Sequence, residues 1–263
     1  MPRDEVIAAG RNHVQSVGRA ASLLIALADQ GGEMTLTDLG KRHRLAATLM
    51  AYHLVDQNQV NGKYRLGLEA LHLGTAVLQQ LDLRQEALPS MQRLSGLTGE
   101  TVNLSILDGY EVIYIEKAEG SSPLRLFSRI GHRAPAYCTG AGKVLLSEMS
   151  LEDVRRILRS QGMASLTPNT ITTLEGFLRA LDFVRTHGCA MDEEECEIGA
   201  SCIAAPVRDH KGRIVAALSI SAPSVRFGPD RQRELVEMLL KTSQDISLRL
   251  GFEEEQLIVT GSG

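Results

Sequence analysis

The chain has 263 residues, enough for two domains, and its 43% hydrophobic and 23% charged residues are typical of globular proteins. No apolar run is long enough to cross a bilayer and the N-terminus lacks the apolar core of a signal peptide, so we expect a cytoplasmic protein without membrane spans. The net charge of −4 does not by itself indicate nucleic-acid binding, although residues 1–81 hold eight Lys or Arg and seven Asp or Glu.

The first predicted elements are three helices. Residues 14–30 carry apolar side chains at helical spacing, and the pair Gly31-Gly32 ends this helix. A short helix is predicted to end at residues 39–42, and a third helix follows at 43–55.

A predicted hairpin follows the three helices. It covers Val60–Leu66 around the pair Asn61-Gly62, which is a strong turn signal. Helix, short helix, helix and basic hairpin are the order of a winged helix-turn-helix domain. In that fold the third helix enters the major groove of DNA and the hairpin, or wing, contacts the backbone.

The remainder alternates helices with strands. Helices are predicted at residues 66–81, 84–97, 140–149, 151–161, 174–187 and 230–250. Strands are predicted at residues 101–107, 111–117, 124–127, 201–207 and 214–221. This order predicts an α+β domain with a largely antiparallel sheet.

Residues 191–221 are the most informative stretch for function. An acidic loop leads into the strand at 201–207, and a polar turn at 208–212 joins it to the strand at 214–221. The small polar residues among the apolar ones are Ser201, Cys202, Ser219 and Ser221. A few hydroxyls and a thiol on an apolar sheet face are typical of a small-molecule pocket, and no nucleophile and base are paired here.

The segment Gly140-Ala141-Gly142-Lys143 superficially resembles a phosphate-binding loop. That motif requires a Gly five residues before Gly142 and a Ser or Thr after Lys143, and Tyr137 and Val144 occupy these positions. We therefore interpret the segment as a Gly-rich turn into a helix, whose free N–H groups point into a cavity.

Thiols, a histidine and acids gather in the sequence at residues 187–202. They are His187, Cys189, Asp192, Glu193, Glu194, Glu195, Cys196 and Cys202. The spacing does not match a zinc site, so we expect a solvated acidic loop with buried, reduced thiols and no metal or cofactor. An enzyme that uses Cys138 or Cys202 with His132 is an alternative, but no sequence feature pairs these residues.

Six segments in this order resemble the IclR family of bacterial transcriptional regulators, from about Val14 to about Leu250. They are SVGRAASLLIALA (16–28), TLTDLGKR (35–42), GKYRLG (62–67), ILDGYEVIYIEK (106–117), PLRLFSRIGHRAPAYCTGAGKVLL (123–146) and MDEEECEIGASCIAAPVRD (191–209). Each segment alone is weakly specific, whereas the ordered set is specific.

The resemblance implies a regulator and not an enzyme. Expected are a winged helix-turn-helix domain at residues 12–66, a linker and dimerisation helix at 67–82, and a GAF/PAS-like effector domain at 83–252. Such proteins assemble as dimers or tetramers, bind double-stranded operator DNA and respond to a small molecule. We expect a repressor whose operator affinity is controlled by a small organic or aromatic acid.

The resemblance also implies two sets of site residues. The positions expected to contact DNA are Arg42, His43, Arg44, Lys63 and Arg65. The positions expected to bind the effector are Gly140, Ala141, Asp192, Cys202, Ser219 and Ser221. The carboxylate of the effector is expected at Gly140 and Ala141, and its other polar groups at Asp192 and the two serines.

The chain departs from the family pattern at one place. Arg42 runs directly into His43, where the family has the turn and the start of the recognition helix, so the chain is short by about eight residues. Either the natural chain has further residues here, or it carries a true deletion. In the second case the protein would be an effector-binding or oligomerisation module without DNA binding.

Overall fold

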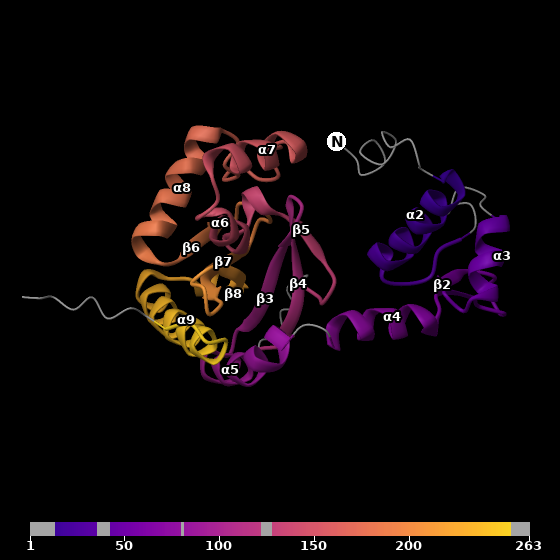
Figure 1. Cartoon of the computed structure of the whole chain (residues 1–263), viewed down its shortest axis with the longest axis horizontal. Helices are drawn as coiled ribbons and strands as arrows, with labels where there is room; N and C mark the ends of the chain where they lie inside the picture. Colours follow the sequence, from indigo (N-terminus) through magenta and orange to yellow (C-terminus); the bar gives the residue numbers. More distant parts are fainter. Residues whose placement is uncertain (1–13, 36–42, 80–81, 122–127, 254–263) are drawn as a thin grey trace, which may run out of the picture. The chain divides into compact units, whose positions relative to one another are not determined.

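The structure is a computed structural model that describes residues 14–35, 43–79, 82–121 and 128–253 (Figure 1). The chain forms two compact units, Met1–Leu81 and Asp82–Gly263. The short helix predicted to end at residues 39–42 and the strand predicted at 124–127 lie outside the described residues. None of the helices in the described ranges is long and apolar enough to span a membrane.

The first unit is built from helices and one hairpin. Its elements are α2 (Gln15–Gln30), α3 (His43–Ala51), β1 (Val55–Gln57), β2 (Tyr64–Leu66) and α4 (Leu68–Gln79). Gly31 ends α2 as predicted, because it adopts a left-handed φ of 65° that closes the last turn. The buried core of this unit consists of Leu23, Leu27, Ala46, Leu49, Val55 and Tyr64.

The predicted helix at 43–55 is wrong at its C-terminal end. The helix stops at Ala51, His53 takes a left-handed φ of 54°, and Val55 begins a strand. The hairpin is accordingly wider than Val60–Leu66, since Val55 pairs with Leu66 across it. The physical reason is burial: Val55 is fully buried, and this tertiary contact outweighs the helical pattern.

The second unit contains one six-stranded sheet with the order β5-β4-β3-β8-β7-β6. Its strands are β3 (Thr101–Asp108), β4 (Glu111–Ala118), β5 (Arg133–Pro135), β6 (Ala190–Glu193), β7 (Ala200–Arg208) and β8 (Ile214–Pro223). All neighbouring strands pair antiparallel, which confirms the predicted fold class at this level. The sequence missed β5 and β6, because three or four residues are too few to display an alternating pattern.

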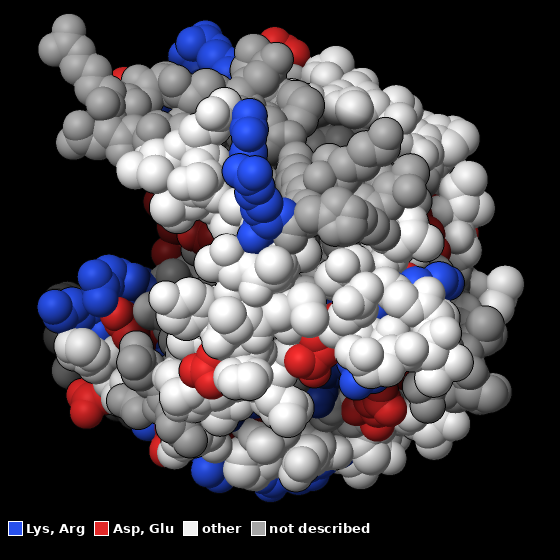
Figure 2. Space-filling view, turned by 90° about the vertical axis from the view of Figure 1, so that its right-hand side faces the viewer, with Lys and Arg blue, Asp and Glu red and all other residues white. Residues whose placement is uncertain are grey.

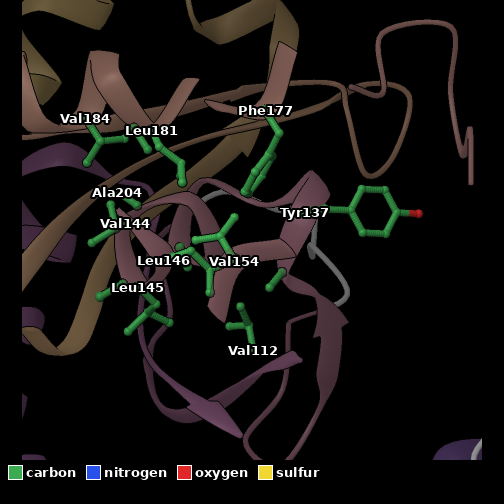
Figure 3. Close-up of a cluster of buried hydrophobic side chains, with 14 of the residues drawn as sticks. Val112, Tyr137, Val144, Leu145, Leu146, Val154, Phe177, Leu181, Val184 and Ala204 are labelled. Atoms are coloured by element: carbon green, nitrogen blue, oxygen red, sulfur yellow. The ribbon is translucent and has the colours of Figure 1, made fainter. Parts of the chain in front are cut away.

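Helices cover both faces of this sheet (Figure 1). α5 (Asp82–Thr98) and α9 (Pro229–Arg249) pack on one face, and α6 (Gly140–Leu146), α7 (Leu151–Gln161) and α8 (Leu174–His187) form the other layer. Figure 3 shows aliphatic side chains from α6, α7 and α8 meeting Val112 and Ala204 of the sheet. At the edge of this cluster Tyr137 points its hydroxyl away and donates it to Ala164 O at 2.8 Å.

The first turn of α6 packs very closely against Ala136 and Cys202. The Thr139 hydroxyl caps the helix by accepting the Gly142 N–H at 3.1 Å. A Cβ on Gly142 would lie 2.0 Å from Ala136 O, and a Cβ on Gly140 would lie 3.1 Å from the Cys202 sulfur on β7. The helix can start here only because these two positions lack side chains.

We predict that Gly142→Ala lowers the free energy of unfolding by at least about 2 kcal/mol, since a backbone oxygen cannot move aside cheaply. Gly96→Ala is the matched control, because Gly96 lies inside α5 and an added Cβ would meet no atom within 4 Å. That change should stabilise the protein by about 0.5–1 kcal/mol. Urea unfolding of both variants measures the difference; equal effects would contradict the close packing of α6.

Candidate functional site

A cavity of about 100 Å³ lies beside the start of α6, on the α6 face of the sheet. Its walls come from β4, β5, β6, β7, β8 and the connections between them. The lining residues are Tyr114, Ser128, His132, Ala134, Thr139, Ala141, Asp192, Cys196, Glu197, Ala200, Ser201, Cys202 and Ser221. The volume suits a small organic molecule and is too small for a cofactor of nucleotide size.

The sheet register brings predicted effector residues together. Asp192 on β6 lies opposite Cys202 on β7, and Cys202 lies opposite Ser221 on β8. These three residues form a row across the cavity, and Ala141 on α6 joins them in its lining.

The other two predicted effector residues lie differently. Gly140 touches Cys202 from the helix side but does not line the cavity. Ser219 shares the strand face of Ser221, is 1% exposed and also does not line the cavity. Four of the six predicted positions therefore surround the cavity, and two lie behind its wall.

Asp192 is a buried acid at the cavity. Burial raises its pKa to about 7, and the neighbouring Glu195 charge contributes in the same direction. The Glu195 N–H, which donates to Asp192 Oδ1 at 2.7 Å, and the Lys143 charge oppose this shift. Near neutral pH this side chain therefore exists in both protonation states, and it can accept or donate a hydrogen bond.

Lys143 has a structural partner and is not free to bind phosphate. Its side chain is 4% exposed, and its ammonium group forms an ion pair with Glu195 and donates to Met191 O at 2.7 Å. The Thr170 hydroxyl donates to Glu195 O at 2.7 Å. The Gly-rich turn thus carries its lysine into a buried ion pair, in agreement with the rejection of a phosphate-binding loop.

The predicted solvated acidic loop is wrong for two of its acids. Asp192 and Glu195 are each only 7% exposed, and Asp192 belongs to strand β6. Their burial follows from the lysine that α6 inserts beside them, a tertiary contact that the sequence does not display. No group of three or more His, Cys, Asp or Glu side chains able to hold a metal occurs in the described part of the chain.

The thiols of Cys138 and Cys202, the two candidate nucleophiles, lack the lowered pKa of a catalytic cysteine. Burial raises the pKa of Cys202 to about 12. A hydrogen bond with Cys196 and burial raise the pKa of Cys138 above its usual range. A catalytic cysteine requires the opposite shift. His132 stacks on Tyr114 with ring centroids 6.1 Å apart.

Three buried polar atoms of the second unit have no hydrogen-bond partner among the described residues. Ser128 Oγ lies in the cavity wall, whereas Asn103 Oδ1 and Ser105 Oγ lie on β3 and do not line the cavity. The other end of the Asn103 amide donates to Ser221 Oγ at 3.3 Å. Sequence reasoning missed these residues and also Tyr114. The polar residues at 103 and 105, which alternate with Val102, Leu104 and Ile106, were the available signal for a polar strand face.

The predicted DNA-contacting residues are only partly described. Arg44 on α3 and Arg65 on β2 are exposed, and Lys63 beside β2 is half-buried. His43 is the first residue of α3 and its side chain is not described, and Arg42 lies outside the described residues. Lys and Arg side chains stand at separate places on the largely uncharged side of the molecule seen in Figure 2.

Comparison with known proteins identifies the family. Residues 75–248 match the family model described as "Bacterial transcriptional regulator IclR C-terminal". The chain belongs to the IclR family of bacterial transcriptional regulators. The HTH-type transcriptional regulator XynR of Escherichia coli (strain K12) is 37% identical over 91% of this chain and 98% of its own length. The HTH-type transcriptional repressor AllR of the same strain is 34% identical over 91% of each chain.

Solved structures of IclR proteins match the fold. The Thermotoga maritima IclR is 28% identical, with a TM-score of 0.75 over 91% of this chain and all of its own. An IclR homolog from Microbacterium hydrocarbonoxydans, complexed with 4-hydroxybenzoate, is 25% identical, with a TM-score of 0.77 over 90% of this chain and 99% of its own. The relatives are regulators, which confirms the prediction that the IclR chain is not an enzyme.

The match with XynR extends over 247 residues, whereas 91% of the 263-residue chain is about 239 residues. The alignment with XynR therefore contains about eight positions without a residue of this chain. This number equals the number of residues by which the chain is expected to be short next to Arg42.

We predict that Asp192→Asn stabilises the protein increasingly as the pH rises. The pKa of Asp192 is raised from 3.8 to about 7 in the folded state, so its stabilising contribution is present at low pH and is lost between about pH 4 and 7. Asparagine keeps the acceptor for the Glu195 N–H and cannot ionise. The difference in unfolding free energy between the variant and the natural protein should grow by about 4 kcal/mol over this range. A constant difference would contradict the buried, ionisable state of Asp192.

Proposed function

We propose that this IclR protein is a DNA-binding transcriptional repressor whose operator affinity is controlled by a small-molecule effector. The observation that carries the proposal is the cavity at α6, where Ala141, Asp192, Cys202 and Ser221 converge although they come from four different elements. A small cavity with a few polar groups on an apolar sheet face is a binding site without catalytic machinery.

The first unit supports the DNA-binding part. α2, α3 and the β1–β2 hairpin follow the order of a winged helix-turn-helix domain, and the relatives are named HTH-type regulators. We assign the domain to residues 12–66, the linker helix to 67–82 and the effector domain to 83–252. Arg42, His43 and Arg44 then belong to the recognition region, and Lys63 and Arg65 to the wing.

The second unit supports a small acid as effector. We propose that its carboxylate binds at the N–H groups of Gly140 and Ala141 and that its other polar groups meet Asp192 and Ser221, with Ser219 behind them. The Ser128 hydroxyl in the cavity wall, which has no partner among the described residues, is available for a further hydrogen bond. The relative complexed with 4-hydroxybenzoate supports an acid of this size.

Effector control requires a link between the two units. We propose that the protein assembles as a dimer or tetramer and that α4 takes part, because its Leu68 and Leu71 are 78% and 67% exposed. An effector that binds one arrangement of the paired DNA-binding domains better than another then changes operator affinity.

A second candidate function follows from the short sequence at Arg42. If about eight residues of the recognition region are truly deleted, the protein is an effector-binding or oligomerisation module without sequence-specific DNA binding. A deletion of this size would produce the difference of about eight positions from XynR.

We predict that Lys63→Ala/Arg65→Ala weakens binding to duplexes of any sequence to a similar degree. Two cations lost from backbone contacts should make the dependence of log affinity on log salt shallower by about 1 to 2. Fluorescence anisotropy at three salt concentrations measures both effects. Unchanged affinity would remove the wing assignment.

We predict that Ser221→Ala weakens effector binding by roughly 10-fold, because the cavity then lacks one hydroxyl. Calorimetry with 4-hydroxybenzoate, lactate and pyruvate, on the natural protein and on Ser219→Ala/Ser221→Ala, identifies the acid and the contribution of both serines. Ser160→Ala on the exposed face of α7 is the control. Affinity equal to that of the natural protein in the double variant would refute the assigned site.

A further inference from the structure

The wing region contains a carboxylate where a DNA-binding surface should exclude one. Glu33 lies directly after the Gly31-Gly32 turn, and the charges of Arg65 and Lys63 act on it. Phosphates repel a carboxylate in this position, so its presence weakens DNA binding unless it contributes something else. Its contacts indicate what that contribution is.

Both oxygens of Glu33 bind the wing. Oε1 accepts the Asn58 side-chain N–H at 2.7 Å, and Oε2 accepts that of Asn61 at 2.7 Å. These two hydrogen bonds are the main reason why the pKa of Glu33 is lowered. The carboxylate is thus charged and shared between two residues of the loop that connects β1 to β2.

The two asparagines transmit this contact to the loop backbone. Asn58 Oδ1 accepts the Val60 N–H at 2.9 Å, and Asn61 Oδ1 accepts the Lys63 N–H at 2.9 Å. Because a backbone N–H can only donate, each amide must direct its NH₂ group toward Glu33. A continuous chain of hydrogen bonds therefore runs from Glu33 to the backbone of Lys63.

The segment that contains Glu33 also binds the hairpin through its backbone. Met34 and Tyr64 exchange both backbone hydrogen bonds at 2.8 Å, which attaches the residue after Glu33 to the first residue of β2. Among the described residues, the hydrogen bonds that would remain to residues 58–63 without the Glu33 contacts are those within the hairpin. Ordering such a loop on DNA would then cost binding free energy.

We propose that Glu33 is a positioning residue for DNA binding: its carboxylate fixes Asn58 and Asn61, so that the wing presents Lys63 and Arg65 to the phosphate backbone. The inference rests on the proposed DNA-binding function. In this role Glu33 strengthens DNA binding, whereas repulsion between its negative charge and the phosphates would weaken it.

Asp56 provides a matched control for charge. It lies on β1 directly opposite Arg65, and no hydrogen bond or ion pair of its side chain occurs within the described residues. Asp56→Asn removes a carboxylate from the same hairpin without removing a wing contact. It should therefore leave DNA affinity unchanged or increase it.

The experiment measures binding of the full chain to a 25-base-pair duplex of arbitrary sequence by fluorescence anisotropy at several salt concentrations. Glu33→Gln keeps the volume but directs an NH₂ group at one of the two asparagine NH₂ groups. We expect about 3- to 10-fold weaker binding, the effect of about one lost hydrogen bond to a charged group. In the Lys63→Ala/Arg65→Ala background the same change should alter affinity less than about 2-fold, because the positioned cations are gone.

A rescue variant separates positioning from a general structural effect. In Glu33→Gln/Asn61→Asp the carboxylate moves to position 61, where it still accepts the Lys63 N–H and can accept from Gln. Net charge is the same as in the natural chain, and affinity should return to within about 2-fold of it. Thermal unfolding of each variant shows that it is folded.

Three results would overturn the proposal: tighter binding by Glu33→Gln, as for Asp56→Asn; equal weakening in both backgrounds; or no rescue by Asn61→Asp. If Lys63→Ala/Arg65→Ala itself has no effect, the wing assignment fails together with the proposal. If that variant weakens binding and Glu33→Gln does not, only the role of Glu33 fails.

Discussion

The first turn of α6 packs against Cys202 of the sheet through Gly140 and against the backbone of Ala136 through Gly142, where there is no room for a Cβ. This contact places the start of the helix beside Cys202 and brings Ala141 to the cavity wall. It also carries Lys143 into the interior, where the ammonium group meets Glu195. The shape of the candidate effector site depends on these consecutive residues.

The buried ion pair has a consequence for Asp192. A buried charge requires a partner, and Lys143 has Glu195 as its counter-ion and Met191 O as a second acceptor. Glu195 in turn donates its N–H to Asp192. The acid at the cavity is therefore held by a chain of contacts that begins on α6. A site supported in this way is pre-organised, as ligand recognition by few polar groups requires.

The sequence predicted the long helices and strands closely, because their apolar patterns extend over eight or more residues. α7 and α8 begin and end at the predicted residues. Short elements such as β5 were missed, and the end of α3 was misplaced because Val55 is buried by a strand pairing. At the candidate site, four of the residues implied by the family resemblance line the cavity: Ala141, Asp192, Cys202 and Ser221. The burial of Glu195 and the cavity positions of Tyr114 and His132 depend on the sheet order, which no local pattern encodes.

The proposed repressor reads DNA sequence as well as binding the DNA backbone. Selection of bound duplexes from a random-sequence pool by the full chain tests this property most directly. We expect enrichment of one shared sequence with two-fold symmetry, since the proposed dimer presents two recognition helices. Binding that falls with salt and enriches no sequence would contradict it, and it would instead support a module that has lost its recognition region.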